Sequence, residues 1–159
     1  MPADKGSAPF KLRAEDADDL AVISACLQDA LVAVRDLAFV QQDRSFLMVA
    51  NRFRWESASG LVGDEAGYQR TLCGITFAAI AGVSYHGFRR SEDERILSLL
   101  SIRLGDYGDE NAIQLEFSGG ATIRLEVDRI LCHVQDLGEP WPTPWQPRHD
   151  VDERCARQR

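Results

Sequence analysis

The sequence is poor in the residues and spacings that mark most chemical sites. It has only three histidines, and its four cysteines (Cys26, Cys73, Cys132 and Cys155) contain no C-x-x-C pair. The common zinc spacing and the dithiol redox motif are therefore missing. Cys26, Cys73 and Cys132 are expected to be small buried apolar residues, and Cys155 an exposed thiol in a polar tail. We expect no metal site and no cofactor.

Long hydrophobic runs are also missing. No apolar run approaches the roughly 20 residues that cross a bilayer, and the polar start has no signal-peptide core. The net charge of −7 argues against broad binding to nucleic acid or to anionic membranes, although a local basic patch remains compatible with it. We therefore expect a cytoplasmic protein with no membrane partner.

What the sequence does contain is typical of a soluble globular domain. Its 159 residues are 45% hydrophobic and 27% charged. This length suits one domain with a sizeable core. We assign the domain to residues 9–147, between a disordered lead (1–8) and a disordered charged tail (148–159).

One amphipathic helix is expected over residues 16–30. Asp16 is a candidate N-cap, and Asp19 three residues later resembles a capping box. Apolar residues then follow at three- and four-residue steps, which predicts one stripe packed on a core. The stripe consists of Leu20, Ile23, Leu27 and Leu31.

After the helix the hydrophobic period changes from 3.6 to 2, which predicts β-strands. With a short strand at 10–13, the expected strands cover 32–40, 46–55, 68–88, 96–104, 113–117 and 123–134, the last with a bulge near Asp128 and Arg129. In the strand at 96–104, the apolar residues Ile96, Leu100, Ile102 and Leu104 share one parity. The predicted fold is α+β, with one N-terminal helix and about seven antiparallel strands in a strongly bent sheet or split barrel. An open two-layer arrangement, with the helix on one sheet face, is the alternative.

The last hairpin allows its register to be predicted. A two-residue turn at Gly119-Gly120 would put the apolar residues of the two strands on opposite faces, which a one-sided core does not permit. A three-residue loop, Ser118-Gly119-Gly120, instead pairs Leu115 with Ile123 and Ile113 with Leu125, with Gly120 left-handed. Gln114 then faces Arg124, and Glu116 faces Thr122.

The segment 136–145 is rich in proline and tryptophan. Prolines at 140, 142, 144 and 147 argue against a regular helix or a central strand. Two interpretations remain open. The segment could strap across the domain and bury Trp141, or it could be an extended peptide offered to a partner.

Several stretches together resemble a known family. These are residues 14–24, the segment NRFRWE at 51–56, residues 97–103 and residues 115–127. They are similar to a family of small, uncharacterised bacterial proteins that carry a domain of unknown function. The resemblance covers most of residues 10–145, and it transfers no activity and no catalytic residue to this chain.

Candidate catalytic residues are few. Cys132 and His133 are adjacent, so on a strand they point to opposite faces and cannot bind one metal together. Cys73 with His86 is a conceivable nucleophile and base, but only if the fold brings them together. We therefore name no catalytic residue, and an enzyme whose site forms only in three dimensions is the alternative.

Four arginines on expected strands are the candidate ligand-binding residues: Arg52, Arg54, Arg103 and Arg124. Their planar forks suit a carboxylate or a phosphate. In NRFRWE, period two puts Phe53 and Trp55 on one face with Leu47 and Val49, which we interpret as the core. Arg52 and Arg54 then point outward, although Phe46 and Met48 share their face.

The favoured function is a non-enzymatic binding or interaction module for a protein partner or a small anionic ligand. RNA binding through the strand arginines is a lesser alternative, because neighbouring glutamates can neutralise them. RNA binding would be salt-sensitive and would be lost when Arg52 and Arg54 become glutamate. The oligomeric state does not follow from the sequence.

Overall fold

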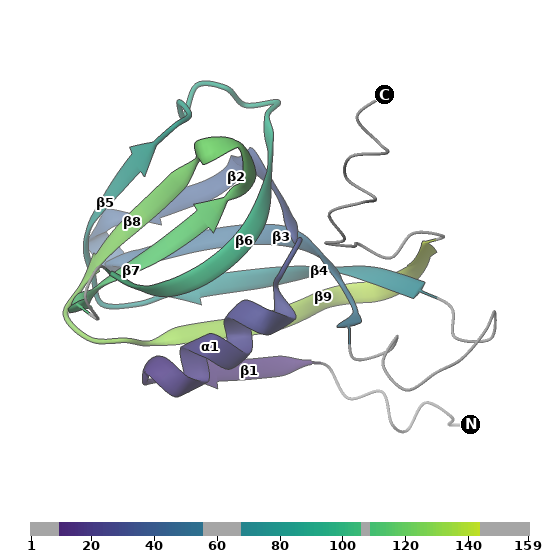
Figure 1. Cartoon of the computed structure of the whole chain (residues 1–159), viewed down its shortest axis with the longest axis horizontal. Coiled ribbons are helices and arrows are strands. Elements are labelled where there is room, and N and C mark those ends of the chain that lie inside the picture. The colour runs from purple at the N-terminus through teal and green to yellow at the C-terminus, as the bar shows by residue number, and fades with distance from the viewer. Residues whose placement is uncertain (1–9, 56–67, 106–108, 144–159) are drawn as a thin grey trace, which may run out of the picture.

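A computed structural model describes residues 10–55, 68–105 and 109–143 (Figure 1). The expected disordered lead (1–8) and charged tail (148–159) lie outside the described residues. The described part contains one α-helix and nine β-strands. The coarse expectation of one helix with an antiparallel sheet is confirmed.

Helix α1 spans Ala17–Cys26 and begins as its sequence predicts. The side chain of Asp16 accepts a hydrogen bond of 2.8 Å from the backbone N–H of Asp19. Leu20 and Ile23 are buried, and so is Leu27 at the C-cap. The predicted end at residue 30 is wrong, because Asp29 takes a positive φ of 68° and turns the chain into the next strand.

The strands form one antiparallel sheet in the order β1-β9-β4-β3-β2-β6-β7-β8-β5. Two segments that were expected to be single strands each form two strands. The structure therefore has nine strands in its described part, where about seven were expected. Ala79, with φ 59°, separates β4 from β5. A loop rather than a bulge at Asp128 and Arg129 separates β8 from β9. The strands are β1 (Lys11–Ala14), β2 (Leu31–Val40), β3 (Ser45–Phe53), β4 (Tyr68–Phe77), β5 (Ile80–His86), β6 (Ile96–Gly105), β7 (Asp109–Phe117), β8 (Thr122–Val127) and β9 (Cys132–Thr143).

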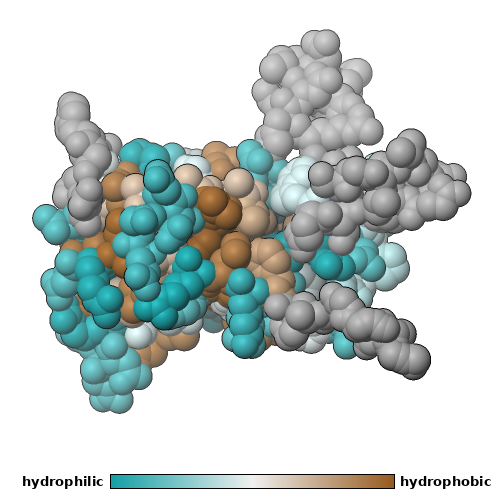
Figure 2. All heavy atoms as spheres, turned by 90° about the horizontal axis from the view of Figure 1, so that it is seen from below, coloured by the Kyte–Doolittle hydropathy of each residue, from teal (hydrophilic) through white to brown (hydrophobic). Residues whose placement is uncertain are grey.

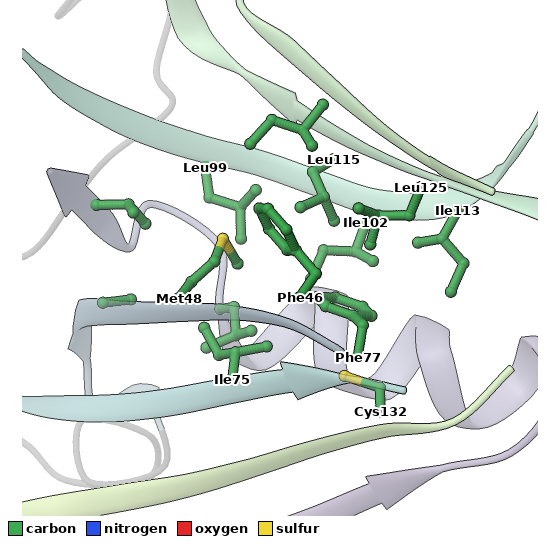
Figure 3. Packing of buried hydrophobic residues seen from close by; sticks show 14 of the residues in the cluster. Phe46, Met48, Ile75, Phe77, Leu99, Ile102, Ile113, Leu115, Leu125 and Cys132 are labelled. Atoms are coloured by element: carbon green, nitrogen blue, oxygen red, sulfur yellow. The ribbon is translucent and has the colours of Figure 1, made fainter. Parts of the chain in front are cut away.

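The sheet folds over its own core. Side chains of β6, β7 and β8, such as Leu115 and Leu125, point toward side chains of β3 and β4, such as Met48 and Phe77 (Figure 3). Leu20, Ile23 and Leu27 of the expected helical stripe join this core. The fourth expected member, Leu31, was assigned wrongly, because it begins β2 and is 38% exposed. The helix is also tied to β6, since the hydroxyl of Ser24 accepts a 2.9 Å hydrogen bond from the backbone N–H of Ile102.

The predicted register of the β7–β8 hairpin is confirmed. Leu115 pairs with Ile123, Ile113 with Leu125, and Gln114 with Arg124. The loop is Ser118–Gly120, and Gly120 has a φ of +85°. The one-sided core therefore selected the register, as the apolar alternation indicated.

The apolar residues that share one parity in β6 do not share one environment. Leu97 and Leu99 are buried, whereas Ile96 and Leu100 are exposed. A register shift between Leu99 and Ser101 changes which side chains face the core, so that Ile102 is buried again. A bulge of this kind reverses the alternation locally, and the sequence carries no clear signal for it.

The proline-rich segment forms a strand, which corrects the expectation, but the strand is irregular: its register with β4 shifts between Arg70 and Leu72, and Gly138 has a φ of +74°. β9 continues through Pro140 and Pro142 and pairs with β4 as far as Thr143. β1 pairs with β9 only over Cys132–Gln135, so among the described residues the prolines lie where β9 has one neighbour. Proline is tolerated at such an edge because no ladder partner needs its missing N–H. Trp141 is 38% exposed, so it is not buried by a strap.

Candidate functional site

Arg52 is the first residue that the structure places differently from the prediction. Its side chain is fully buried, and it follows Phe46, Met48 and Ala50 on the core face of β3. Val49, which was expected in the core, is exposed. The alternation in NRFRWE was therefore correct, but the assignment of faces was reversed.

The buried guanidinium is held by a carboxylate from a distant strand. Nε and Nη2 of Arg52 donate to the two oxygens of Asp136 on β9, both at 2.9 Å. The ring of Phe10 covers the guanidinium, with its centroid 4.1 Å from Cζ. Such a fork-to-fork pair satisfies both charges in the interior. This arrangement makes Arg52 a core residue of the fold.

Cys73 on β4 lies beside this pair, since its cross-strand partners are Asp136 on β9 and Ala50, two residues before Arg52 on β3. Burial raises the pKa of its thiol to about 12, although the charge of Arg52 opposes the effect. Burial likewise raises the pKa of Cys132 to about 12. Both thiols are therefore neutral and unreactive near pH 7, as expected of buried apolar residues. Cys26 is half-buried, and Cys155 lies outside the described residues.

Arg54 belongs to a cluster at the end of β3. Its backbone N–H donates to the carbonyl of Gln69 at 2.8 Å, and its guanidinium donates to the amide oxygen of the same residue. Nearby, Trp55 packs edge-on against Phe53 at 4.7 Å and donates its indole N–H to the carbonyl of Gln28 at 3.1 Å. Phe53 is thus buried on the outer side of the sheet.

Arg70 completes this cluster from β4. Its Nε donates to the side-chain oxygen of Asn51 at 2.6 Å, and its Cζ lies 6.0 Å from the ring centre of Phe53. Burial lowers the pKa of Arg70, and the charge of Asp29 partly offsets this. The sequence prediction did not identify Arg70, because its strand position is uninformative until Asn51 is placed beside it.

Arg103 and Arg124 lie together on the outer face of β6, β7 and β8. Arg103 donates to Glu116 at 2.6 Å, and Arg124 donates to Glu126 at 2.8 Å. Gln114 lies between them, with its amide oxygen 3.4 Å from Nη1 of Arg124. The hydrogen bond from Arg103 lowers the pKa of Glu116, and desolvation of the carboxylate offsets this lowering only in part. The structure therefore brings these two arginines together, away from Arg52.

A small cavity of about 270 Å³ lies beside the start of α1. Its polar lining includes Asp16, which caps the helix, and Asp128, which is ion-paired with Arg44 at 2.5 Å. These carboxylates already have structural roles. Among the described residues, no cluster of three or more His, Cys, Asp or Glu is arranged to hold a metal ion. Cys132 is buried and His133 is exposed, which confirms that they face opposite ways.

The outer face of β6, β2, β3, β4 and β9 carries exposed apolar side chains. Some of them lie in one row of cross-strand partners, and the others lie next to that row. Ser98, Leu31, Asn51, Leu72 and Leu137 are successive cross-strand partners, so they share a face. The row crosses five strands, roughly 19 Å at the usual strand spacing. We call the exposed apolar members of this face, all 37–54% exposed, the outer apolar band: Leu31, Val49, Leu72, Ile96, Leu100 and Leu137.

Two members of the band, Leu72 on β4 and Leu137 on β9, are direct cross-strand partners. Leu137 leans over Gly74, where a Cβ would lie 3.6 Å from its Cδ1. On a different side of the molecule, seen from below Figure 1 where α1 and β1 lie, Figure 2 shows further hydrophobic surface among hydrophilic patches. Apolar surface shared by several strands marks contact sites more often than single exposed side chains do.

The fold and these surfaces define an antiparallel α+β domain with a polar arginine–glutamate ladder on one outer face and an apolar band on another. The family model described as "Protein of unknown function (DUF2948)" matches residues 10–149, so the chain belongs to this family. This confirms the resemblance to a family that carries a domain of unknown function. No curated protein and no solved structure matches the chain. No helix in the described part of the chain is long and apolar enough to span a membrane.

Proposed function

We propose that this protein is a non-enzymatic interaction module that binds a protein partner through the outer apolar band. The observation that carries the proposal is the row in which Leu31, Leu72 and Leu137 share one face, with Val49 beside it. A partner with an apolar patch would remove these side chains from water, at about 25 cal/mol for each Å² buried. Asn51, which lies in the row between Leu31 and Leu72, and Arg70 beside it would supply polar contacts to the partner.

Two further features belong to the same proposal. The buried thiols of Cys73 and Cys132, which form no disulfide, support a reducing location, the cytoplasm. Two carboxylates of the cavity near α1 already have partners outside it, because Asp16 accepts from the backbone of Asp19 and Asp128 is ion-paired with Arg44; this favours a binding role over an enzymatic one. An enzyme with a site assembled in three dimensions is the alternative.

A small anionic ligand is the second candidate partner. Arg103 and Arg124 favour it, because their guanidiniums lie near each other on one outer face and are partly exposed. Arg52 is buried in its pair with Asp136, so its part in such a site would be to maintain the sheet. Glu116 and Glu126 offset the charge of the exposed arginines, which makes a protein partner the stronger proposal.

The test is a comparison of partners captured by matched variants. Leu72→Asp and Leu137→Asp place a charge in the band, whereas Val22→Asp changes a 54% exposed side chain on α1 outside it. Each tagged variant is used to purify proteins and metabolites from extracts of the source cells, with quantitative mass spectrometry. We expect a stoichiometric protein that is lost from both band variants and kept by Val22→Asp.

Two results would overturn the proposal. One is an identical set of captured proteins for all three variants and the unchanged protein, with each variant shown by circular dichroism to be folded. The other is a stoichiometric metabolite in place of a protein, which would favour the enzyme alternative.

A further inference from the structure

The sheet face that carries the outer apolar band is uncharged at its centre. Two neighbouring rows of cross-strand partners cross β3, β4 and β9 on this face, and their members are Val49, Gly74 and Gln135 in one row and Asn51, Leu72 and Leu137 in the other. No member of these two rows is charged, although 27% of the chain is. An antiparallel sheet that turns one face to water usually makes that face polar, so this face indicates a contact with another protein layer.

The lack of charge favours a second copy of the chain as that layer. Two copies that each carry a net charge of −7 repel one another where their charged surfaces meet. Contact through an uncharged face removes apolar surface from water and places no like charges opposite each other. A partner selected by its charge would instead need a complementary charged patch, and the two rows offer none.

The longer row also has the symmetry that two identical faces require. In strand order it reads Ser98, Leu31, Asn51, Leu72 and Leu137, so Asn51 lies on the middle strand with a leucine on each side. In an isologous dimer the same patch meets itself, so residue i contacts j while j contacts i. A twofold axis above Asn51 and in line with β3 places Leu31 of each copy opposite Leu72 of the other.

On that axis Asn51 faces Asn51 of the second copy. Asn51 is partly exposed, and its amide carries both donors and an acceptor oxygen, so two such amides can hydrogen-bond to each other. Sheets pack about 10 Å apart, a distance that two facing asparagine side chains and one hydrogen bond of about 2.9 Å fill. Nε of Arg70 donates to the oxygen of Asn51 at 2.6 Å, which holds the amide in place, and a carbonyl oxygen can accept a second hydrogen bond.

We propose that the outer apolar band binds a second copy of this chain, so that two outer sheet faces pack into a β-sandwich with Asn51 on the twofold axis. The inference rests on the proposed function of the band and names its partner. The row is only about 19 Å wide, and interfaces of small area are typical of transient association. The dimer is therefore reversible, with a dissociation constant on the order of micromolar.

The experiment measures the mass of the full chain by sedimentation equilibrium over a wide range of concentration. We expect the mass to rise from that of one chain to that of two. Leu72→Asp and Asn51→Asp should each raise the dissociation constant of the dimer at least about tenfold. Asn51→Asp keeps an oxygen that accepts from Arg70 but sets two carboxylates opposite each other. Val22→Asp, on α1 outside the band, should change the dissociation constant less than about twofold.

Cross-linking tests the position of the axis. Asn51→Cys is made in a chain that also carries Cys26→Ala and Cys155→Ala, so that the remaining native thiols are buried. A bismaleimide reagent that spans about 10 Å, the spacing of packed sheets, should join these chains in pairs. Val22→Cys in the same chain should remain single, and equal cross-linking of the two would overturn the placement of the axis.

The outcomes separate this inference from the proposed function. The inference is overturned if the chain stays monomeric up to about 1 mM, or if Leu72→Asp and Asn51→Asp both leave the dimer intact. A monomeric chain that captures a different protein, lost in Leu72→Asp, would keep the proposed function and rule out the second copy. Captured proteins that do not differ between the variants would overturn the proposed function itself. Circular dichroism shows whether each variant is folded, and Asn51→Asp decides the result if Leu72→Asp is not.

Discussion

Arg52 and Asp136 lie 84 residues apart in the sequence, yet their side chains form two parallel hydrogen bonds of 2.9 Å inside the sheet. Arg52 is fully buried, and the side chain of Asp136 is only 14% exposed. The pair joins β3 to β9 across β4, beneath Phe10. This pair connects the most specific sequence segment, NRFRWE, to the strand that carries the prolines.

Removal of the arginine should strongly destabilise the protein. Arg52→Met leaves the carboxylate of Asp136 in the interior without its partner. We expect the free energy of unfolding to fall by about 3–5 kcal/mol, the usual cost of breaking a buried pair. Urea denaturation followed by tryptophan fluorescence measures this change.

The double variant distinguishes the pair from its individual charges. Arg52→Met combined with Asp136→Leu removes both charges and keeps apolar volume, so much of the lost stability should return. Equal stability of the single and double variants would contradict this account. Arg103→Met, which alters an exposed pair on another face, serves as the matched control.

The buried thiols predict a dependence of stability on alkaline pH. The pKa of Cys73 and that of Cys132 rise from 9.0 to about 12 on burial. Above pH 9 the unfolded chain loses these protons while the folded chain keeps them, so the thiols contribute a loss of stability as pH rises toward 12. Equilibrium unfolding of Cys73→Ala across this range should show a shallower fall than the unchanged protein, and identical slopes would contradict the prediction.

Two glycines with positive φ should respond differently to alanine. A Cβ at Gly87 would lie 2.3 Å from the carbonyl oxygen of Gly120, whereas a Cβ at Gly120 has nothing within 4 Å. Gly120→Ala should cost about 1 kcal/mol from backbone strain alone. Gly87→Ala adds a backbone clash and should cost clearly more. Thermal unfolding ranks the two, and the opposite order would disprove the stated reason.

The exposed pair of Arg103 and Glu116 predicts a weak acid sensitivity. The pKa of Glu116 is lowered mainly by its hydrogen bond with Arg103, so the pair stabilises the fold above the ordinary carboxyl pKa and loses this effect as pH falls through the lowered value. Because both side chains are partly exposed, the contribution at neutral pH should be about 0.5–1 kcal/mol. Glu116→Gln should lose that amount at pH 7 and little at pH 2, as measured by urea denaturation.

RNA binding requires a different test from the one that the sequence suggested. Arg52→Glu would place a second carboxylate beside Asp136 in the core, so any loss of binding would reflect unfolding. Arg103→Glu with Arg124→Glu changes partly exposed arginines instead. With a net charge of −7, we expect the unchanged protein to show no binding to single-stranded RNA at low salt in fluorescence anisotropy. Salt-sensitive binding lost in this double variant would contradict the expectation.

The β7–β8 hairpin shows where sequence reasoning was sufficient. Both arms are local and one face is buried, so the apolar alternation of Leu115 and Ile123 excluded the two-residue turn. Asp16 was likewise identified as the N-cap of α1 because capping depends on neighbours three residues away. These predictions required no knowledge of distant strands.

β3 shows where sequence reasoning failed. Both of its faces contain apolar residues, with Phe46 and Met48 on one and Leu47 and Val49 on the other. The arginines were taken to mark the solvent-exposed face of β3. This inference was wrong, because Asp136 on β9 forms the hydrogen bonds and the ion pair that allow Arg52 to be buried. The candidate arginines were grouped because all of them are arginines on expected strands. The structure separates Arg52, which is buried, from Arg103 and Arg124, which lie on an outer face.

The sequence by itself determined what depends on near neighbours: the period of each segment, the helix start, the hairpin register and the antiparallel α+β class. Only the tertiary structure decided which face of β3 packs on the core and how many strands form. It also decided that the prolines of β9 lie where this strand has one described neighbour, so that a strand can form there. The physical reason is that alternation sorts side chains into two sets, while burial depends on which strands arrive on either side. The pairing of Asp136 with Arg52 arises from that arrangement of distant strands.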